Sequence, residues 1–320
     1  MKFQNREVIN FIFCNHPLSN KTVDPDYEKE YALALRLGFN VALFSYEELE
    51  LGNLKLFQYE ELELGNLKLF QPPEKEIKGF TIYRGWMMKP ELYKNFYQKL
   101  SEREIFLVNS PEEYNYCHLL PKWYDEVFPE TPKSYWTTDN SIEEAVKILK
   151  EVKKDAIIKD YVKSRKYEWK DSFFIPFHQN MEYKRKIIEN FIHRQGESLI
   201  GGIVFREFIS LKSLGLHQKS AIPISEEYRI VILLGKIISI SSYWIRKEKI
   251  NKEKIENFVT KYIHKIKSNF FTIDLGVLEN GELIIIELGD GQVSGLQEEK
   301  VENYYRNIDY LLTKKILVKK

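Results

Sequence analysis

Short apolar runs alternate with amphipathic stretches along the first 110 residues of the chain. The runs EVINFIFC, NVALF, GFTIYRGWMM and EIFLVN have the length and composition of buried strands. Between them, DPDYEKEYALALRLGF has an acidic first turn and Gly38 as a stop, and PELYKNFYQKLSER opens with Pro90, so both predict helices. Strands that alternate with helices predict a parallel sheet whose strand carboxyl ends form a binding edge.

The pattern changes after Ser110. The first segment, SPEEYNYCHLLPKWYDEVF, is aromatic-rich and predicted to be helical. A strand, a helix and a strand are predicted within 131–162, followed by a charged loop at 163–172. A further helix and strand are predicted within 184–211. Ser141 and Glu144 predict a capping box at the start of the helix within 131–162. Strands and turns then alternate in YRIVILL, KIISISSYWI, FFTIDLGVL and ELIIIEL, and a basic helix begins near Val301. We predict an α/β (α+β) protein with an N-terminal α/β domain at 1–110, a linker helix and small lobe at 111–205, and a C-terminal lobe at 206–320.

Thirteen residues, YEELELGNLKLFQ, occur twice without a substitution, at 46–58 and 59–71. Repeat architectures need about three or more units of about 20 residues or longer, because one unit cannot bury its own apolar face. Packing does not demand identity at exposed positions either. We interpret the repeat at 46–71 as a tandem duplication tolerated in a surface connection, where extra length costs little closure entropy.

The composition excludes several classes of partner. Forty-eight basic and 47 acidic side chains give a formal charge of +1, which does not suggest a nucleic-acid partner. The most apolar window, RIVILLGKIISISSYWI, is interrupted by Gly235 and Lys236 and predicts a hairpin rather than a membrane span. Two cysteines are too few for a disulfide framework or a cysteine metal site. We therefore expect a cytoplasmic protein.

Two carboxylates, Asp274 and Glu287, each lie in a strongly apolar strand run. If these strands pair as a hairpin about Asn280 and Gly281, Asp274 lies opposite Glu287 or close to it. Two inward carboxylates repel each other unless cations lie between them, so their amidation would keep or raise stability without metal. Carboxylate oxygens are also ligands of the Mg²⁺ that accompanies nucleotide phosphates. The alternative is a strand face on which both side chains meet water.

Single charged residues in other apolar strands add chemistry. Lys159 ends the run AIIKDYV, where its ammonium suits a phosphate contact or, alternatively, extends to solvent. Glu207 precedes a connector whose backbone could read an adenine edge, although simple alternation in a half-buried strand would also place it there. Arg229 and Arg246 add cations on neighbouring strands.

The order of these segments resembles the ATP-grasp superfamily. The resemblance covers about residues 111–300, through TPKS, EEAVKIL, AIIKDY, FREFI, EEYRIVILLGKIIS and IDLGVLENGELIIIELGDG. The segments IYRGWMM and CHLLPKWY are similar to a divergent clade of bacterial and phage members. The resemblance implies a two-lobed ATP-grasp fold preceded by a pre-ATP-grasp domain, with ATP and Mg²⁺ as cofactors.

The resemblance also implies site roles by position. The residues that would contact ATP are Lys159 with Lys122 or Lys133 at the phosphates, and Glu207, Phe208 and Ile209 as the adenine hinge. Asp274 and Glu287 would hold Mg²⁺, and Arg229 or Arg246 would face phosphate or acyl-phosphate oxygens. The loop at 163–172 would form a lid.

Three further positions bear on the site. The family commonly has Asn two residues after the metal Glu, where this chain has Gly289, so Asp290 becomes the candidate replacement ligand. Arg84 ends an apolar strand of the N-terminal sheet, where it could grip a substrate carboxylate with Trp86 as a wall; the alternative is an arginine that satisfies loop carbonyls. The loop LGDGQVSGL has Ser294 in place of the third glycine of a dinucleotide fingerprint, so we discount that motif.

The resemblance implies an ADP-forming ligase that phosphorylates a carboxylate with ATP and joins it to an amine. Its substrate would be a small molecule, a peptide or a protein. Two alternatives stay open: an ATP-dependent kinase of a small molecule, and a nucleotide-binding protein without turnover, which Gly289 motivates.

Overall fold

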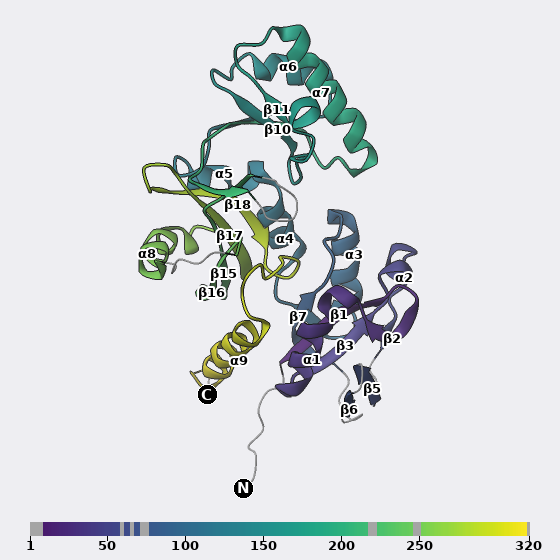
Figure 1. Cartoon of the computed structure of the whole chain (residues 1–320). Helices are drawn as coiled ribbons and strands as arrows, with labels where there is room; N and C mark the ends of the chain where they lie inside the picture. Colours follow the sequence, from purple (N-terminus) through teal and green to yellow (C-terminus); the bar gives the residue numbers. More distant parts are fainter. Residues whose placement is uncertain are drawn as a thin grey trace.

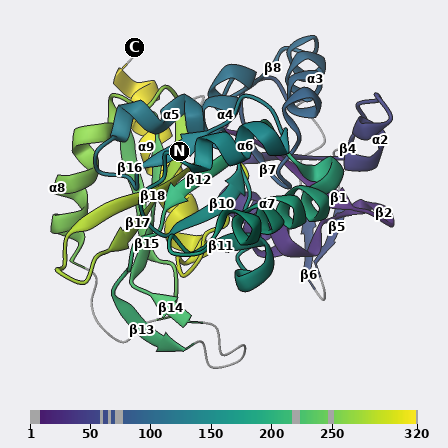
Figure 2. The same ribbon diagram turned by 90° about the horizontal axis from the view of Figure 1, so that it is seen from above.

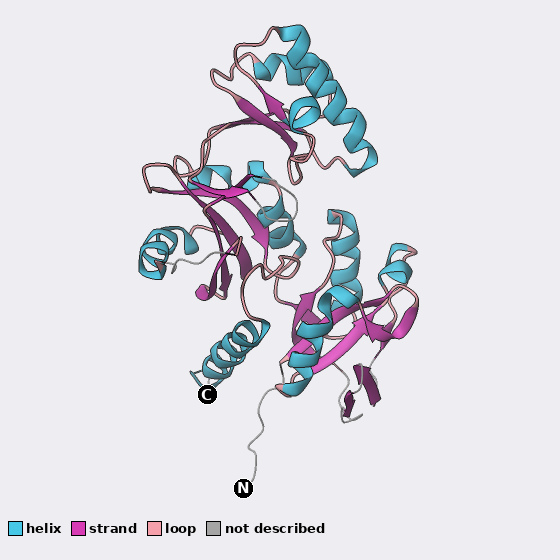
Figure 3. Cartoon of the chain, viewed as in Figure 1, coloured by secondary structure: helices cyan, strands magenta, loops and turns pink. Residues whose placement is uncertain are grey.

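The computed structural model describes residues 9–57, 61–64, 67–70, 77–216, 223–245 and 251–318 of the 320-residue chain. Arg246, one of the predicted phosphate contacts, lies outside the described residues. The chain builds three parts, each around its own sheet: an N-terminal domain, a small lobe and a C-terminal lobe (Figures 1 and 3). Among the described residues, no helix combines the length and the hydropathy that a membrane span requires.

The N-terminal domain contains the predicted parallel sheet. Strands β3, β1, β7 and β8 are neighbours in this order and all three pairs are parallel, while β4 and β2 add antiparallel pairs. Gly38 adopts φ +78° directly after the first helix, as its predicted role as a stop requires. The elements are β1 (Asn10–His16), β2 (Ser19–Val23), η1 (Pro25–Tyr27), α1 (Glu28–Arg36), β3 (Asn40–Phe44), α2 (Tyr46–Glu50), β4 (Leu56–Phe57), β7 (Gly79–Arg84), α3 (Pro90–Ser101) and β8 (Ile105–Leu107).

The two identical copies of the duplication fold differently. The first forms α2 and β4, and its Leu49 and Leu54 are buried in the core of the N-terminal domain. The second forms a separate two-stranded sheet of β5 (Glu61–Leu64) and β6 (Leu67–Phe70). Because the sequences are the same, tertiary surroundings decide which structure each copy adopts.

The small lobe is a four-stranded antiparallel sheet in the order β11-β10-β12-β9. Strand alternation directs Ile158 and Phe205 to one face, where they pack in a core with residues of α6 and α7, and directs Lys159 and Arg206 to the other face. Ser141 caps α6 by accepting a hydrogen bond from the Glu144 N–H at 3.1 Å. The elements are β9 (Ser134–Trp136), α6 (Ile142–Leu149), β10 (Ala156–Asp160), η2 (Trp169–Phe173), β11 (Phe174–Ile175), α7 (Met181–Gln195), η3 (Gly196–Ser198) and β12 (Ile203–Glu207).

The C-terminal lobe is a four-stranded antiparallel sheet in the order β16-β15-β17-β18. The hairpin predicted about Gly235 is formed by β15 and β16, and a second hairpin, β13 with β14, extends from this lobe (Figure 2). The elements are β13 (Ser213–Leu216), β14 (Pro223–Ser225), β15 (Glu227–Leu233), β16 (Lys236–Ser242), α8 (Lys252–Ile263), β17 (Phe270–Val277), β18 (Leu283–Asp290) and α9 (Val301–Val318).

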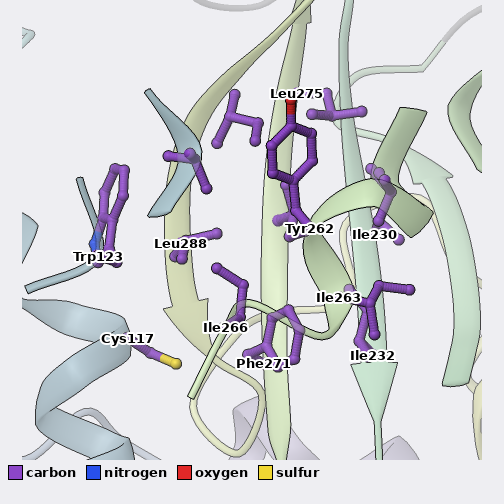
Figure 4. Packing of buried hydrophobic residues seen from close by; sticks show 14 of the residues in the cluster. Cys117, Trp123, Ile230, Ile232, Tyr262, Ile263, Ile266, Phe271, Leu275 and Leu288 are labelled. Carbon is purple, nitrogen blue, oxygen red and sulfur yellow. The ribbon is translucent and has the colours of Figure 1, made fainter. Parts of the chain in front are cut away.

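The linker helices α4 (Pro111–His118) and α5 (Leu120–Val127) pack against β18. Their Cys117 and Trp123 join one buried cluster with Ile230, Phe271 and Tyr262 of the C-terminal lobe (Figure 4). The domain prediction groups these helices with the small lobe, whereas their apolar faces belong to the core of the C-terminal lobe. Strand β12 likewise continues to Glu207, beyond the predicted boundary at 205.

The N-terminal domain and the C-terminal lobe share a second core. Helix α9 packs on α1 and β16 (Figure 1). Its Tyr305 lies in one cluster with Phe11, Phe39, Val231 and Phe270. Because this interface is apolar, it holds the N-terminal domain in a defined position beside the C-terminal sheet.

Candidate active site

A cleft of ≈ 510 Å³ lies between the small lobe and the C-terminal lobe. The small lobe contributes Lys159 and Arg206, and the C-terminal sheet contributes Arg229, Asp274 and Glu287. The lining also includes three residues of the predicted lid, Lys163, Ser164 and Lys166. Met87 of the N-terminal domain and the loop at 293–295 line the cleft as well. The face of the C-terminal sheet that carries these polar groups is opposite the face that packs on α4, α5 and α8.

Asp274 and Glu287 are cross-strand partners on β17 and β18, as the predicted hairpin requires. Gly281 adopts φ +84° in the connecting turn, where its N–H donates to the Leu278 carbonyl at 2.8 Å. The turn sets the register as far as Leu275, which lies opposite Ile285. A β-bulge between Asp274 and Leu275 then shifts the register by one residue, so that Asp274 lies opposite Glu287 and both carboxylates reach the same part of the cleft.

Each carboxylate has a cationic partner. Arg229, opposite Asp274 on β15, donates from Nε to Oδ1 at 2.8 Å and from Nη2 to Oδ2 at 2.7 Å. Lys159 Nζ donates to Glu287 Oε1 at 2.8 Å across the cleft between the lobes. We call Lys159, Arg229, Asp274 and Glu287 the charge quartet; two positive and two negative side chains offset one another in it.

The quartet carboxylates differ in their electrostatics. Burial raises the pKa of Asp274 more than the Arg229 guanidinium lowers it, so this pKa lies above its ordinary value. Burial also opposes ionisation of Glu287, but Lys159, Arg206 and Arg229 outweigh it and hold the pKa of Glu287 below its ordinary value. The Glu287 side chain is 42% exposed and that of Asp274 is 9% exposed, so Glu287 is the more accessible ligand.

Arg206 and His118 are two of the cleft residues that the sequence analysis did not predict. Arg206 bridges the lobes, donating to the Ile286 carbonyl and, from Nη2, to Thr131 Oγ1 at 2.6 Å; burial lowers its pKa to about 10. Strand alternation in FREFI could have identified it, because Arg206 and Glu207 must face opposite sides of β12. His118, at the end of α4, is 9% exposed and also lines the cleft. No feature of its local sequence distinguishes it from a histidine of the linker core.

A family model describes this part of the chain. It is the ATP-grasp domain, R2K clade family 3, and it matches residues 149–308, half of the chain. The chain belongs to the ATP-grasp family. The matched range contains the whole charge quartet, and no curated protein sequence matches the chain significantly.

Solved structures of ATP-grasp proteins share the fold along almost the whole chain. A RimK domain ATP-grasp protein from Sphaerobacter thermophilus superposes with a TM-score of 0.59 at 8% identity, covering 96% of this chain and 98% of that one. D-alanyl-alanine synthetase A from Vibrio cholerae gives 0.55 at 11% identity, with 97% and 100% coverage. The ATP-grasp ligase PsnB, complexed with a variant of its minimal precursor, Mg and ADP, gives 0.53 at 12% identity, with 98% and 99% coverage. The N-terminal domain is therefore part of the shared ATP-grasp architecture.

Arg84 does not reach the ATP-grasp cleft. It is fully buried, pairs with Glu30 through Nε at 2.8 Å and Nη2 at 2.9 Å, and donates from Nη1 to the carbonyls of Gly291, Gln292 and Ser294 at 2.9–3.0 Å. This geometry matches the alternative prediction for Arg84, in which the arginine satisfies loop carbonyls. Arg84 holds the glycine-rich loop against the N-terminal domain, and Val293, Ser294 and Gly295 of this loop line the cleft.

Asp290 lies apart from the two predicted metal carboxylates. It is fully buried at the end of β18, where it accepts hydrogen bonds from Asn109 Nδ2 at 2.5 Å and from the Gln292 N–H at 2.9 Å. Asp290 therefore links the start of α4 to the glycine-rich loop instead of replacing the family's Asn. Among the described residues, no group of three or more His, Cys, Asp or Glu side chains could hold a metal ion.

Gly289 occupies the position of that Asn, and its surroundings are tight. A Cβ there would lie 2.8 Å from Thr272 Oγ1 and 3.0 Å from Ser294 Oγ, which are hydrogen-bonded to each other at 3.0 Å. The hydroxyl pair of Thr272 and Ser294 thus fills the space that a side chain at 289 would need.

The remaining predicted ATP contacts lie outside the lining of the cleft. Lys122 is exposed on α5, and Lys133 is exposed with its ammonium 5.1 Å from the centre of the Tyr135 ring. Glu207 pairs with Lys154 at 3.0 Å. The N–H groups of Glu207 and Phe208 donate to the carbonyls of Lys133 and Asp155, both at 2.8 Å.

Ile209 is half-buried one residue beyond Phe208. The exposed Phe208 ring meets Trp169 and Phe174 edge-on, with ring centres 5.7 and 5.2 Å apart. The predicted hinge at 207–209 thus lies beside an aromatic group at the end of β12.

The predicted lid is held to the small lobe at its base. Glu168 accepts hydrogen bonds from Arg165 Nε at 2.8 Å, Ser172 Oγ at 2.7 Å and Arg194 Nη1 at 2.5 Å. These donors hold the pKa of Glu168 well below its ordinary value, at about 2. Lys163 and Lys166, on the same segment, line the cleft and bring positive charge close to the quartet.

Proposed function

We propose that the protein is an ATP- and Mg²⁺-dependent ligase that forms ADP and joins a carboxylate to an amine through an acyl phosphate. The observation that carries the proposal is the charge quartet, in a cleft between two lobes of a chain that belongs to the ATP-grasp family. A kinase and a nucleotide-binding protein without turnover remain the alternatives that the experiment below separates.

The quartet is chemically suited to Mg²⁺ and nucleotide phosphates. Mg²⁺ is usually bound by one or two carboxylates together with phosphate oxygens and water, so Asp274 and Glu287 suffice as its protein ligands. When bound, the metal would neutralise phosphate charge and orient the transferred group. Without the metal, Lys159 and Arg229 balance the charge of the two carboxylates. With the metal bound, both cations could instead donate hydrogen bonds to phosphate oxygens.

The chain's own residues would perform three tasks in the reaction. Lys159 and Arg229 would stabilise the charge that develops while the substrate carboxylate attacks the γ-phosphate and ADP leaves. Lys163 and Lys166 would neutralise the acyl phosphate from the lid side. The lid at 163–172 would exclude water, because hydrolysis of the acyl phosphate would waste ATP.

The structural neighbours support a carboxylate–amine reaction, but they do not identify the substrates of this chain. They include a D-alanyl-alanine synthetase, a D-cycloserine synthetase and a ligase bound to its precursor peptide. We propose a carboxylate substrate that is a small molecule, a peptide or a protein.

The test measures ADP and free phosphate in the presence of ATP, Mg²⁺ and pairs drawn from amino acids, dipeptides and amines. Release of both products that requires a carboxylate and an amine together supports the ligase. ADP with a phosphorylated product and no free phosphate supports the kinase. Nucleotide binding by calorimetry, without ADP under any of these conditions, supports the protein without turnover.

A further inference from the structure

His118 presents an unused hydrogen-bond acceptor at the cleft. Its Nδ1 lies 3.0 Å from the carbonyl oxygen of Tyr114. A carbonyl oxygen only accepts, so Nδ1 carries the hydrogen, and the neutral ring has its lone pair on Nε2. Nε2 is buried, and no donor among the described residues is within hydrogen-bond distance of it. A buried polar atom without a partner is unusual in a native structure and calls for an explanation, which a catalytic role supplies for a residue that lines the cleft.

The imidazole ring is fixed in this orientation. Its centre is 4.3 Å from that of the Tyr114 ring, at an interplanar angle of 62°. Tyr114 is itself held, because its hydroxyl accepts from the Met88 N–H at 2.8 Å and donates to the Met88 carbonyl at 2.9 Å. Tyr114 stacks on Tyr93 with ring centres 3.8 Å apart. The acceptor is therefore preorganised by α4 and by the N-terminal domain.

The charges around His118 leave the ring neutral. Burial lowers its pKa to about 4, the Tyr114 carbonyl and Glu287 act in the opposite direction, and Lys163 adds to the effect of burial. The ring thus combines a free lone pair with a place in the lining of the cleft that also holds the charge quartet and Lys163.

A second cavity leads to this part of the cleft. It measures ≈ 580 Å³ and lies between α2 and α3 of the N-terminal domain and the small-lobe residues Ser198 and Ile200. Met87 and Lys163 line both cavities, so the two adjoin there. Its lining mixes apolar residues such as Leu49 and Leu92 with two acidic and two basic side chains, Glu50, Glu91, Lys89 and Lys163.

We propose that His118 is a catalytic residue of the second half-reaction, in which its Nε2 receives the proton of the attacking amine. The inference rests on the proposed ligase function. The amine nitrogen forms a bond with the acyl carbon, the carbon–oxygen bond to phosphate breaks, and inorganic phosphate leaves with that electron pair. The proton released by the nitrogen passes to Nε2, and the imidazolium returns it to water after the products depart.

Two substitutions separate proton transfer from hydrogen bonding. His118→Asn keeps a donor for the Tyr114 carbonyl and deletes the atom at Nε2, whereas His118→Gln keeps an acceptor there, an amide oxygen that is far less basic than an imidazole nitrogen. The assay uses ATP, Mg²⁺ and the carboxylate that supports turnover by the wild type, with either its amine or hydroxylamine, a weakly basic nucleophile that needs no catalytic base.

Both variants are expected to lose about 10²- to 10⁴-fold in amine-dependent kcat. They are expected to keep hydroxamate formation and ATP affinity within a few-fold of the wild type. If His118→Gln kept full amine-dependent activity, Nε2 would act only as a hydrogen-bond acceptor, and the proposal would be overturned. Equal losses with amine and hydroxylamine would also overturn it, since His118 would then support the first half-reaction or the fold.

A spectroscopic measurement keeps the inference independent of the substrate. Ring-nitrogen NMR of the protein, with His118→Asn to assign the signal, is expected to show Nδ1 protonated and Nε2 unprotonated between about pH 6 and 8. A protonated Nε2 in this range would refute the proposal. If the wild type forms neither amide nor hydroxamate with any pair tested, the ligase function fails on its own, whatever the tautomer of His118.

Discussion

Arg229 and Asp274, which are opposite each other on β15 and β17, form a bidentate ion pair with distances of 2.8 and 2.7 Å. The sequence alone suggested that Asp274 and Glu287 repel each other and that amidation would keep or raise stability without metal. The guanidinium offsets this repulsion, because its two parallel hydrogen bonds satisfy both oxygens of Asp274. Removal of the Asp274 charge is therefore expected to destabilise the protein.

Asp274→Asn should abolish Mg²⁺-dependent turnover and lower the free energy of unfolding by about 3 kcal/mol, since it leaves a largely buried guanidinium without its counter-ion. Glu287→Gln should also abolish turnover and should destabilise the protein, because the Lys159 side chain is only 7% exposed and loses its counter-ion. The cost should be smaller than that of Asp274→Asn, since Lys159 makes one hydrogen bond to Glu287 whereas Arg229 makes two to Asp274. Urea unfolding without metal, alongside the ADP assay, measures both effects. Normal turnover by both variants would contradict the metal assignment.

Lys159→Ala should weaken ATP binding by about 1.5–3 kcal/mol, the worth of one charge-assisted hydrogen bond to phosphate. Lys122→Ala is the matched control, because Lys122 is exposed on α5 and does not line the cleft. Isothermal titration calorimetry with ATP and Mg²⁺ compares the two. Equal affinities of the variants would show that Lys159 only neutralises Glu287.

Arg84→Lys should lower the melting temperature and leave the KM for the carboxylate substrate unchanged. A lysine cannot reproduce the bonds of the guanidinium to Glu30 and to three loop carbonyls, and we expect a loss of about 3 kcal/mol. Scanning calorimetry and steady-state kinetics of the folded fraction test this. A raised KM at an unchanged melting temperature would restore Arg84 as a substrate clamp.

Deletion of residues 59–71 should leave ATP affinity intact and change the urea midpoint only modestly. The remaining copy can form α2 and β4, which bury Leu49 and Leu54. As a control, Leu49→Ala in the deletion variant should cost about 2–5 kcal/mol, because the side chain has 0% exposure. An insoluble deletion variant would refute the interpretation of the repeat as dispensable.

Asp290 should make stability depend on pH. Burial raises its pKa from 3.8 to about 7. Between these values the native state binds more protons than the unfolded state, so stability should fall by a few kcal/mol as the pH rises from about 4 to about 7. Asp290→Asn should flatten this profile, measured as urea midpoints across the range. If the urea midpoint of Asp290→Asn depended on pH as steeply as that of the wild type, Asp290 would not be the source of the pH dependence.

The sequence by itself determined the features that depend on neighbouring residues. Strand and helix periodicity identified the elements, Gly38 ended α1, and the turn about Gly281 paired β17 with β18. These features are local, because backbone geometry and turn chemistry set them within about ten residues. The order of weak motifs along the chain also led to the ATP-grasp family.

Tertiary structure decided which charged groups meet. Arg84 binds carbonyls more than 200 residues away, and Lys159 reaches Glu287 across the cleft between lobes. The two identical copies of YEELELGNLKLFQ adopt different structures, and in the first copy Leu49 and Leu54 are buried in the core of the N-terminal domain. Such contacts depend on how separate sheets pack, and no local pattern encodes that packing. His118 is the clearest case, since its unused Nε2 becomes visible only once α4 is packed beside the cleft.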